Sequence, residues 1–323
     1  MSFSVLITAA SRRVALMKSF KEAVNKIGGK LIAVDCDRYS SALYFADKYY
    51  LVPLVSDKDY IKAIKNIAQK ERVKLIIPTV DFELMLWAEN KKRFDEIGIS
   101  VSISPRETVK ICSDKLNTYS FFIKNDLPFP KSFTTDNLPE NINFPLFIKP
   151  RRGRGSDDSI KINNNEEFEF YIKRIDSPLI SEFLDGDEFT TDVLFSKDGK
   201  LLRCVHRYRL VIRAGVSDRG KTFKNKKLTS YIENIGKKLE FEGAVNIQGK
   251  ISDKKISFFE INPRFSGGIQ LTIASGANFP QLIIDELSGN KITPNLYDYE
   301  DNLLMTSFEN SLFIDSNNSL IKI

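Results

Sequence analysis

The sequence has one histidine and three cysteines among its 323 residues, and both shortages limit its chemistry. Cys36, Cys112 and Cys204 are odd in number and widely spaced, so they predict neither a disulfide framework nor a CxxC metal site. His206 adjoins Arg207 and has no candidate nucleophile nearby, which argues against a nucleophile-histidine-acid triad. We expect reduced thiols and a histidine that is either structural or in contact with substrate.

The sequence also lacks long apolar runs and the common nucleotide-binding motifs. No apolar run approaches the roughly 20 residues of a membrane span, and residues 1–8 lack the basic start of a signal peptide. We therefore expect a cytoplasmic protein with no membrane partner. Neither GxxxxGK[ST] nor GxGxxG is found, which argues against an ordinary P-loop or Rossmann nucleotide site.

The net charge is positive, but the basic residues are not distributed as in a typical nucleic-acid-binding protein. The net charge is +6, and the basic residues are spread along the chain without interleaved aromatic residues. An anionic small molecule explains this pattern as well as nucleic acid does, and nucleic acid is not the partner that we expect.

What the sequence does have is a hydrophobic content of 42%, enough for two or three packed units, and a first third that alternates between two periodicities. The expected strands are residues 3–8, 30–35 and 73–78, and the expected helices are 13–26, 60–70 and 81–93. This alternation predicts a parallel, doubly wound sheet, whose ligands gather beyond the carboxyl ends of the strands. Asp81, in one of the loops at those ends, either caps the following helix or contacts a substrate.

A β-hairpin is predicted near residue 250, with strands at 244–251 and 256–262 around a turn at 253–255. A three-residue turn places Ser252 opposite Ile256. The same register pairs Gln248 with Glu260, and Asn246 with Asn262.

The hairpin brings three oxygen-bearing side chains to one face. Side chains alternate along a strand, so Glu260 and Asn262 share a side and Gln248 joins them across the ladder. Such oxygens suit Mg²⁺ that also binds nucleotide phosphates. A polar edge facing solvent is the alternative, but Phe258 and Phe259 precede Glu260 directly, and a buried carboxylate needs a partner or a metal.

The residues 246–248, followed by the run EINPRFSGG at 260–268, resemble the metal-binding end of the ATP-grasp enzymes, above all the ligase domains of the carbamoyl-phosphate synthase large subunit. This resemblance implies ATP as cofactor together with Mg²⁺ or Mn²⁺. It assigns Gln248, Glu260 and Asn262 to the metal, and Arg264 to an acyl phosphate, which a guanidinium can bind bidentately.

The same resemblance assigns residues to the nucleotide phosphates. Lys115 follows Ser113, the expected N-cap of a helix, and Lys149 closes an apolar strand. The loop 151–156, ending at Ser156, resembles the phosphate loop of the family. It departs from the family by its three arginines and by the acidic residues after Ser156, so an exposed basic loop stays open as an alternative.

Further positions follow in the family's order. Glu182, Phe183 and Leu184 resemble the segment that meets adenine, and Glu188 resembles the residue that binds the ribose hydroxyls.

Three arginines on one predicted strand, Arg207, Arg209 and Arg213, share a face by parity. They form either a solvated face or a clamp for the γ-phosphate and an acidic substrate. The resemblance favours Arg213 as a catalytic residue and, after it, Arg209.

The expected architecture is α/β: a doubly wound pre-ATP-grasp domain at residues 1–111, a two-lobed α+β ATP-grasp domain at 112–290, and a strand-rich extension at 291–323. The resemblance implies an ATP-dependent ligase that joins a small-molecule carboxylate to an amine, and it allows a homodimer. One alternative is a catalytically silent ATP-binding sensor or partner subunit. Another, a sugar-nucleotide-binding doubly wound protein, explains only the first domain.

Overall fold

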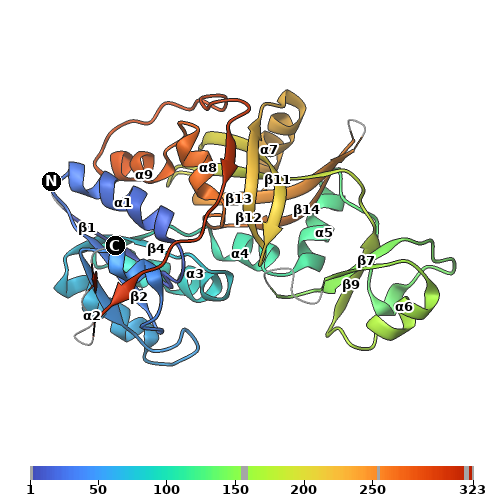
Figure 1. Cartoon of the computed structure of the whole chain (residues 1–323), viewed down its shortest axis with the longest axis horizontal. Coiled ribbons are helices and arrows are strands. Elements are labelled where there is room, and N and C mark those ends of the chain that lie inside the picture. The colour runs from blue at the N-terminus through green and yellow to red at the C-terminus, as the bar shows by residue number, and fades with distance from the viewer. Residues whose placement is uncertain (1–2, 154–158, 253–254, 316–319, 322–323) are drawn as a thin grey trace.

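The computed structural model describes residues 3–153, 159–252, 255–315 and 320–321. In Figure 1 a blue first domain lies at one end of the molecule and a small green lobe, around α6, at the other. The large sheet and the C-terminal helices lie between them. The predicted class, a doubly wound domain followed by a two-lobed α+β unit, is confirmed.

The first domain contains a five-stranded parallel sheet in the order β3-β2-β1-β4-β5. Its strands are β1 (Ser4–Ile7), β2 (Leu31–Asp35), β3 (Lys48–Leu51), β4 (Val73–Ile77) and β5 (Ser100–Val101). The predicted β1, β2 and β4 are confirmed to within a residue. The sequence does not predict the edge strands, because β5 is only two residues long and β3 is half exposed.

Helices cover both faces of this sheet, as the alternation of strand side chains requires. They are α1 (Val14–Lys26), the short 3-10 helix η1 (Ser41–Phe45), α2 (Tyr60–Lys70) and α3 (Asp81–Asp95). Ile7 packs in a cluster with Phe20 of α1, whereas its neighbour Leu6 packs in a cluster with Trp87 and Phe94 of α3.

Two helices lead into the small lobe: α4 (Arg106–Cys112) and α5 (Lys115–Lys124). The predicted N-cap Ser113 is wrong, because Asp114 caps α5 and its carboxylate accepts the N–H of Leu116 at 3.0 Å. Ser113 instead ends α4. The side chain that reaches the free N–H groups decides which residue caps a helix, and here the carboxylate does.

The small lobe is a four-stranded antiparallel sheet in the order β6-β9-β7-β8 with one helix on it. Its elements are β6 (Ser132–Phe133), β7 (Leu146–Pro150), β8 (Ile160–Ile162), α6 (Asn165–Tyr171) and β9 (Pro178–Glu182). Ile148, Ile180 and Phe168 of α6 form its core, so the lobe has a hydrophobic centre of its own.

The large lobe is a six-stranded antiparallel sheet in the order β14-β13-β10-β11-β12-β15. Its strands are β10 (Asp187–Phe195), β11 (Leu201–Arg213), β12 (Val216–Phe223), β13 (Gly243–Ser252), β14 (Lys255–Asn262) and β15 (Leu304–Thr306). The helices of this half are α7 (Lys226–Lys238), α8 (Ile269–Ala274) and α9 (Phe279–Leu287). The short strands β16 (Phe313–Ile314) and β17 (Leu320–Ile321) pair with each other.

The domain limits at residues 111 and 290 stay predictions. Helix α4 runs across the first of them, and β15 joins the large sheet from beyond the second. Within the described ranges, no helix is long and apolar enough to cross a membrane.

The hairpin of β13 and β14 has the predicted pairs at its functional end but a different turn. Gln248 pairs with Glu260, and Asn246 with Asn262. Ser252 faces Lys255 rather than the predicted Ile256. The register shifts between Gln248 and Gly249, so that Phe259 has no partner across the ladder. This bulge makes up for the shorter turn and restores the predicted pairs beyond it.

Candidate functional site

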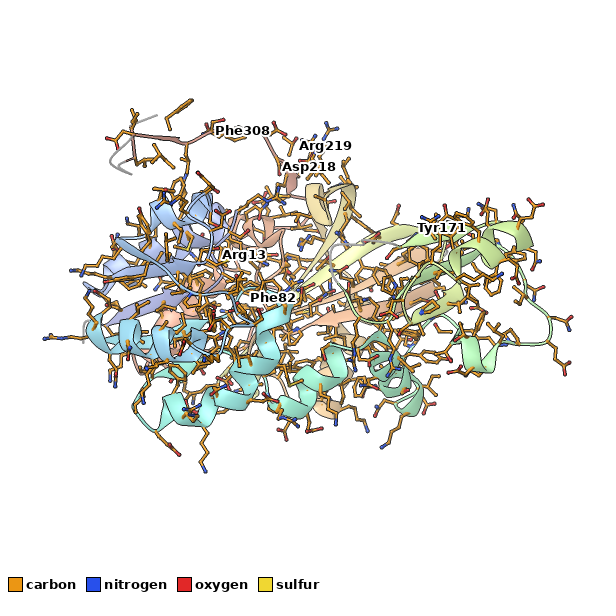
Figure 2. All side chains as sticks on the ribbon, turned by 90° about the horizontal axis from the view of Figure 1, so that it is seen from below. Arg13, Phe82, Tyr171, Asp218, Arg219 and Phe308 are labelled. Atoms are coloured by element: carbon orange, nitrogen blue, oxygen red, sulfur yellow. The ribbon has the colours of Figure 1, made fainter. Side chains whose placement is uncertain are left out.

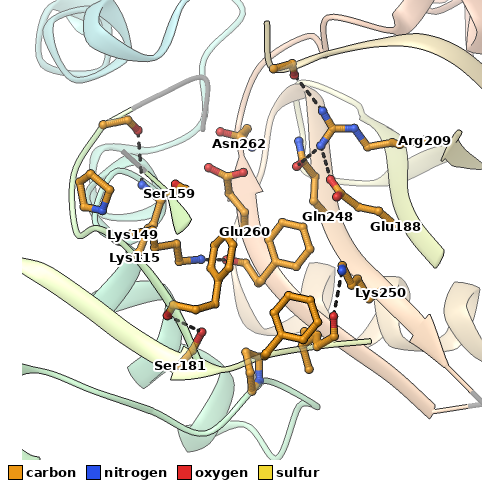
Figure 3. A pocket seen from close by; sticks show the side chains of 18 of the residues that line it. Lys115, Lys149, Ser159, Ser181, Glu188, Arg209, Gln248, Lys250, Glu260 and Asn262 are labelled. Atoms are coloured by element: carbon orange, nitrogen blue, oxygen red, sulfur yellow. Dashed lines mark hydrogen bonds and ion pairs between the residues drawn. The ribbon is translucent and has the colours of Figure 1, made fainter. Parts of the chain in front are cut away.

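A cleft between the small and large lobes brings together most of the predicted site residues (Figure 3). Those that line it are Lys115, Lys149, Glu182, Phe183, Leu184, Glu188, Gln248, Glu260, Asn262 and Arg264. Ser156 lies outside the described residues. Arg213 does not line the cleft.

Lys149 stands at the end of β7 with only 8% of its surface exposed. Its Nζ donates to the carbonyl of Phe259 at 3.3 Å and lies 5.4 Å from the centre of that ring. The bulge frees this carbonyl from the ladder. The Lys149 pKa is lowered to about 8, because burial, helped by the charge of Lys115, outweighs the opposing charge of Glu260. Within the described residues no carboxylate pairs with Lys149, so the ammonium is available to an anion.

Lys115 begins helix α5 beside the basic loop, and its Nζ donates to the carbonyl of Gly153 at 3.4 Å. The loop arginines nearest to it are already paired. Arg151 donates to the buried carboxylate of Asp114 at 2.6 Å, and Arg152 lies 3.5 Å from the same group. The N-cap of α5 thus also anchors the start of the loop.

The predicted adenine segment forms the end of β9 and the residues after it. The backbone N–H of Glu182 donates to Lys131, and the N–H of Phe183 donates to Pro145. The carbonyl of Leu184 accepts from Lys250 Nζ at 2.8 Å. The segment therefore contributes backbone groups and a flat apolar ring to the wall of the cleft.

Asn246 orients the side chains of the predicted metal residues. Its Oδ1 accepts from Gln248 Nε2 at 3.1 Å and from Asn262 Nδ2 at 3.4 Å. Since Asn262 donates through its nitrogen, its oxygen is left to face a cation. The oxygen of Gln248, however, accepts from Arg209 at 3.0 Å.

Glu260 is the one carboxylate of the predicted metal trio. Within the described ranges its side chain forms no hydrogen bond or ion pair. No group of three His, Cys, Asp or Glu residues in that part of the chain could hold a metal. One carboxylate and one or two amide oxygens suit Mg²⁺ only if phosphate oxygens complete the coordination.

Glu188 and Arg209 form an ion pair on neighbouring strands of the large sheet. Glu188 is 23% exposed and Arg209 7%, and the Arg209 guanidinium also donates to the carbonyl of Gly215 at 2.8 Å. Burial lowers the pKa of Arg209, and the charge of Glu188 opposes that shift. Arg209 thus holds both Glu188 and Gln248 in place.

Arg264 binds a residue of the first domain. Its Nε and Nη2 donate to the two oxygens of Asp81 at 2.8 and 2.7 Å. Burial alone would raise the pKa of Asp81, but the charge and hydrogen bonds of Arg264 outweigh it and lower the pKa. Burial would lower the pKa of Arg264, but the charge and hydrogen bonds of Asp81 outweigh burial, so the Arg264 pKa is raised.

The sequence left open whether Asp81 caps helix α3 or contacts a substrate. Ahead of α3, the N–H groups of Thr79 and of the N-cap residue Val80 donate to Oε1 of Glu83 at 2.7 and 3.2 Å. The carboxylate of Asp81 lines the cleft, where Arg264 binds both of its oxygens and its own backbone N–H also lowers its pKa.

The parity argument for the arginines of β11 fails at Arg213. Arg207 and Arg209 share a face, since both donate to the hydroxyl of Ser217. The register between β11 and β12 then shifts twice, between Arg209 and Ile212. Arg213 is 66% exposed and pairs with Glu309 at 2.9 Å, away from the cleft.

His206 is structural, one of the two roles expected for it. The ring is buried, and its nitrogens each lie 2.9 Å from a hydroxyl, those of Thr191 and Thr229. Burial lowers the His206 pKa to about 3, so the imidazole is neutral at physiological pH. The three cysteines are free thiols, as expected.

Sequence reasoning missed Lys250 and Phe147, which also line the cleft. Lys250 had a usable signal, because it follows Gln248 by two residues on one strand and therefore points to the same side. Phe147 had none, since an aromatic residue in an apolar strand is normally part of a core.

Two family models match the chain. One, described as the PylC-like N-terminal domain, covers residues 5–102. The other, described as ATP-grasp in the biosynthetic pathway with Ter operon, covers residues 174–309.

Relatives in sequence are distant. An arginine-specific carbamoyl phosphate synthase large chain from Geobacillus stearothermophilus is 22% identical over an alignment of 268 positions, and the match covers 76% of this chain and 25% of that protein. A D-alanine–D-alanine ligase from Petrotoga mobilis is 23% identical over an alignment of 275 positions, and the match covers 72% of this chain and 91% of that protein. The chain thus spans about a quarter of the length of the carbamoyl phosphate synthase large chain.

Solved structures share the fold over most of the chain. N5-carboxyaminoimidazole synthetase from Staphylococcus aureus, complexed with ADP, matches with a TM-score of 0.72 at 14% identity, covering 91% of this chain and 80% of that one. L-amino acid ligase from Bacillus licheniformis matches with a TM-score of 0.71 at 16% identity, covering 90% and 77%. The resemblance to the ATP-grasp enzymes that the sequence predicts is confirmed.

Proposed function

We propose that this chain, which has the ATP-grasp fold, is an ATP-dependent ligase that activates a carboxylate and joins it to an amine, with ADP and phosphate as the other products. One observation carries the proposal: a single cleft combines two lysines that lack carboxylate partners in the described chain with the unpaired carboxylate of Glu260. Cations for phosphates and an acidic ligand for a phosphate-bound metal are the two requirements for phosphoryl transfer from ATP.

The chemistry has two steps. A carboxylate oxygen of the substrate attacks the γ-phosphorus of ATP, and the bond to ADP breaks, with its electron pair leaving on ADP. The amine nitrogen then attacks the acyl carbon of the resulting acyl phosphate, the bond from that carbon to the phosphate oxygen breaks, and the amine loses a proton. Catalysis of this kind depends chiefly on positioning and on charge neutralisation.

The residues of the cleft divide this work. Lys115 and Lys149 hold the nucleotide phosphates, and the segment 182–184 meets the adenine ring. Glu188 accepts from the ribose hydroxyls with the oxygen that Arg209 leaves exposed. Arg264, fixed by Asp81, opposes the charge that develops on the transferred phosphate.

Glu260 and Asn262 hold Mg²⁺ in this proposal, with Gln248 as a third ligand once its oxygen turns from Arg209. The metal supplies neutralisation of phosphate charge and orients the γ-phosphate. The same oxygen donors suit Mn²⁺. Among the related structures, the S. aureus synthetase was solved with ADP, which supports a nucleotide in the corresponding cleft.

The test is a matrix of substrates. The purified chain is incubated with Mg-ATP and panels of carboxylic acids, amino acids and amines, and ADP is measured with a mass search for the condensed product. We expect ADP release to depend on an acid and an amine together. ADP release that no pair stimulates would contradict a ligase.

A catalytically silent ATP-binding sensor or partner subunit is the second candidate. One observation favours it, since the oxygen of Gln248 and the fork of Arg264 are both engaged within the protein. A sensor binds Mg-ATP, measured by calorimetry, without pair-dependent turnover. The cytoplasmic location and the homodimer stay predictions.

A further inference from the structure

A second cavity adjoins the cleft on the side of the first domain, and its lining is dominated by arginine. Arg13, Arg207, Arg209 and Arg264 line it together with one acidic residue, Asp81. The two cavities share Arg264, Arg209 and Asp81, so a molecule in the second cavity reaches the proposed site of phosphoryl transfer.

Three of these four guanidiniums already have a carboxylate. Arg264 binds Asp81, and Arg209 binds Glu188. Arg207, which is 2% exposed, donates to Asp192 at 2.8 Å.

Arg13 is the one of these four arginines that forms no ion pair with a carboxylate of the described residues. It precedes α1 at the carboxyl end of β1, where Figure 2 labels it, and it is partly buried. Its Nη1 lies 3.4 Å from the carbonyls of Phe265 and Ser266, and no carboxylate within the described ranges pairs with it. The Arg13 pKa is lowered to about 10, because burial and the charge of Arg264 outweigh the opposing charges of Asp81 and Glu83. Neither of these carboxylates forms an ion pair with Arg13 within the described ranges.

The glycines after Ser266 let the chain pack closely against the wall of the cavity. A Cβ on Gly268 would lie 2.7 Å from Nη1 of Arg207, and a Cβ on Gly267 would lie 2.9 Å from a methyl carbon of Val216. Any side chain at these positions would displace the arginine or the wall of β12. Glycine at both positions therefore keeps Arg207 and Val216, which line the same cavity as Arg13, in their places.

We propose that this cavity is a subsite for an anionic group, a carboxylate or a phosphate, which a substrate carries in addition to its reacting group and which binds Arg13. A partly buried guanidinium with no carboxylate in hydrogen-bond contact is costly, and a carboxylate or phosphate satisfies its planar donors. The proposal rests on the ligase function only in naming the ligand a substrate. An amino acid, whose carboxylate binds Arg13 while its nitrogen reacts, belongs to the class that fits.

The test uses bare anions as probes. Malonate and inorganic phosphate are each titrated by calorimetry into the protein saturated with a non-hydrolysable ATP analogue and Mg²⁺, which occupy the nucleotide phosphate site. We expect the wild type to bind at least one of the two with a millimolar or lower Kd. The tighter probe indicates whether the natural group is a carboxylate or a phosphate.

Variants of adjacent arginines give the matched comparison. Arg13→Gln should weaken binding of that probe at least tenfold, Arg13→Lys should weaken it less, and Arg12→Gln, at an exposed neighbour, should leave it unchanged. Binding of the ATP analogue and the Tm check that each variant is folded. No anion binding by the wild type, or equal binding by Arg13→Gln, would overturn the subsite.

Turnover gives a separate readout. If a ligase substrate is an amino acid, Arg13→Gln should raise its KM without raising the KM of the matching decarboxylated amine. If no pair of substrates supports turnover, the ligase proposal fails, whereas the malonate and phosphate titrations still decide the subsite.

Discussion

The two ends of the cleft carry positive charge in different ways. At the nucleotide end, Lys115 and Lys149 donate hydrogen bonds to carbonyl oxygens and form no ion pair with a carboxylate of the described residues. At the end near the first domain, Arg209 and Arg264 each bind a carboxylate, as does Arg207 in the adjoining cavity.

The lysines are therefore free to bind a ligand, whereas the ion-paired arginines fix the geometry of the site. An ammonium on a flexible stem can follow phosphates as they move, whereas a guanidinium fork bound to a carboxylate is rigid. We therefore expect changes at the lysine end to affect nucleotide binding and changes at the arginine end to affect geometry and turnover. Arg13, which lines the adjoining cavity, is the exception, because no carboxylate in the described part of the chain forms an ion pair with it.

The largest effect is expected at Glu260, the negative group between the two ends. Glu260→Ala should lower Mg²⁺-dependent ADP formation at least about 100-fold, because the proposed metal loses its only charged protein ligand. Steady-state ADP assays over a range of Mg²⁺ concentrations measure this loss. Glu240→Ala, at an exposed position, is the control. Full activity of Glu260→Ala at ordinary Mg²⁺ would remove Glu260 from the metal site.

Lys149→Met tests the lysine end through two opposite effects. Nucleotide affinity should fall about 30-fold with the loss of a charge on the phosphates. The free protein should gain about 2 kcal/mol in its free energy of unfolding at pH 7, because a buried charge is removed.

The sign of the second effect follows from the lowered pKa. Between about pH 8 and the ordinary lysine value of 10.5, the unfolded wild type binds more protons than the folded one. Wild-type stability therefore rises with pH across this window relative to Lys149→Met, and the gain of the variant shrinks. Denaturant unfolding at several pH values measures it. A constant difference would mean that the Lys149 pKa is normal.

The arginine end should respond in turnover rather than in binding. Arg264→Lys keeps the charge but loses the fork that Asp81 holds, so kcat should fall about tenfold while the Kd of the ATP analogue is unchanged. A matching loss of nucleotide affinity would place Arg264 at the nucleotide end instead.

The ion pair between Asp81 and Arg264 should affect the free energy of unfolding in a pH-dependent way. Asp81→Asn leaves a half-buried guanidinium without its counter-charge and should cost about 2 kcal/mol of stability at neutral pH. The Asp81 pKa is below its usual 3.8, so the pair stabilises the fold above that value and is lost as the pH falls through the lowered pKa. Acid unfolding of the wild type and the variant, compared by circular dichroism, should therefore converge at low pH.

The smallest effect separates two arginines of one strand. Arg209→Ala should lower turnover several-fold, because Glu188 and Gln248 lose their shared partner. Arg213→Ala, at an exposed pair, should change activity less than about twofold and stability by less than 0.5 kcal/mol. A larger loss for Arg213→Ala would restore the catalytic role that the sequence suggests for it.

Local patterns predicted those features that depend on residues close in sequence. The pairing of Gln248 with Glu260 follows from the alternation of two neighbouring strands and holds even though the predicted turn is wrong. Lys149 was found because a charged residue that closes an apolar strand is unusual.

Features that depend on distant residues were not predictable in this way. Asp81 and Arg264 are 183 positions apart, and nothing near either residue indicates the other. The bulge at Phe259 depends on backbone pairing with β13, and the two register shifts that turn Arg213 away depend on β12. Parity describes a regular strand and fails wherever the ladder slips.

The most direct test of the ligase proposal follows an oxygen atom. The acid identified by the substrate matrix is labelled with ¹⁸O in its carboxylate and incubated with the amine, the protein and Mg-ATP. Because the attacking oxygen stays on phosphorus when the amine displaces phosphate, the account predicts one ¹⁸O in the released phosphate, detected by mass spectrometry. Unlabelled phosphate, formed at the same rate with and without the amine, would contradict carboxylate activation and indicate simple hydrolysis of ATP.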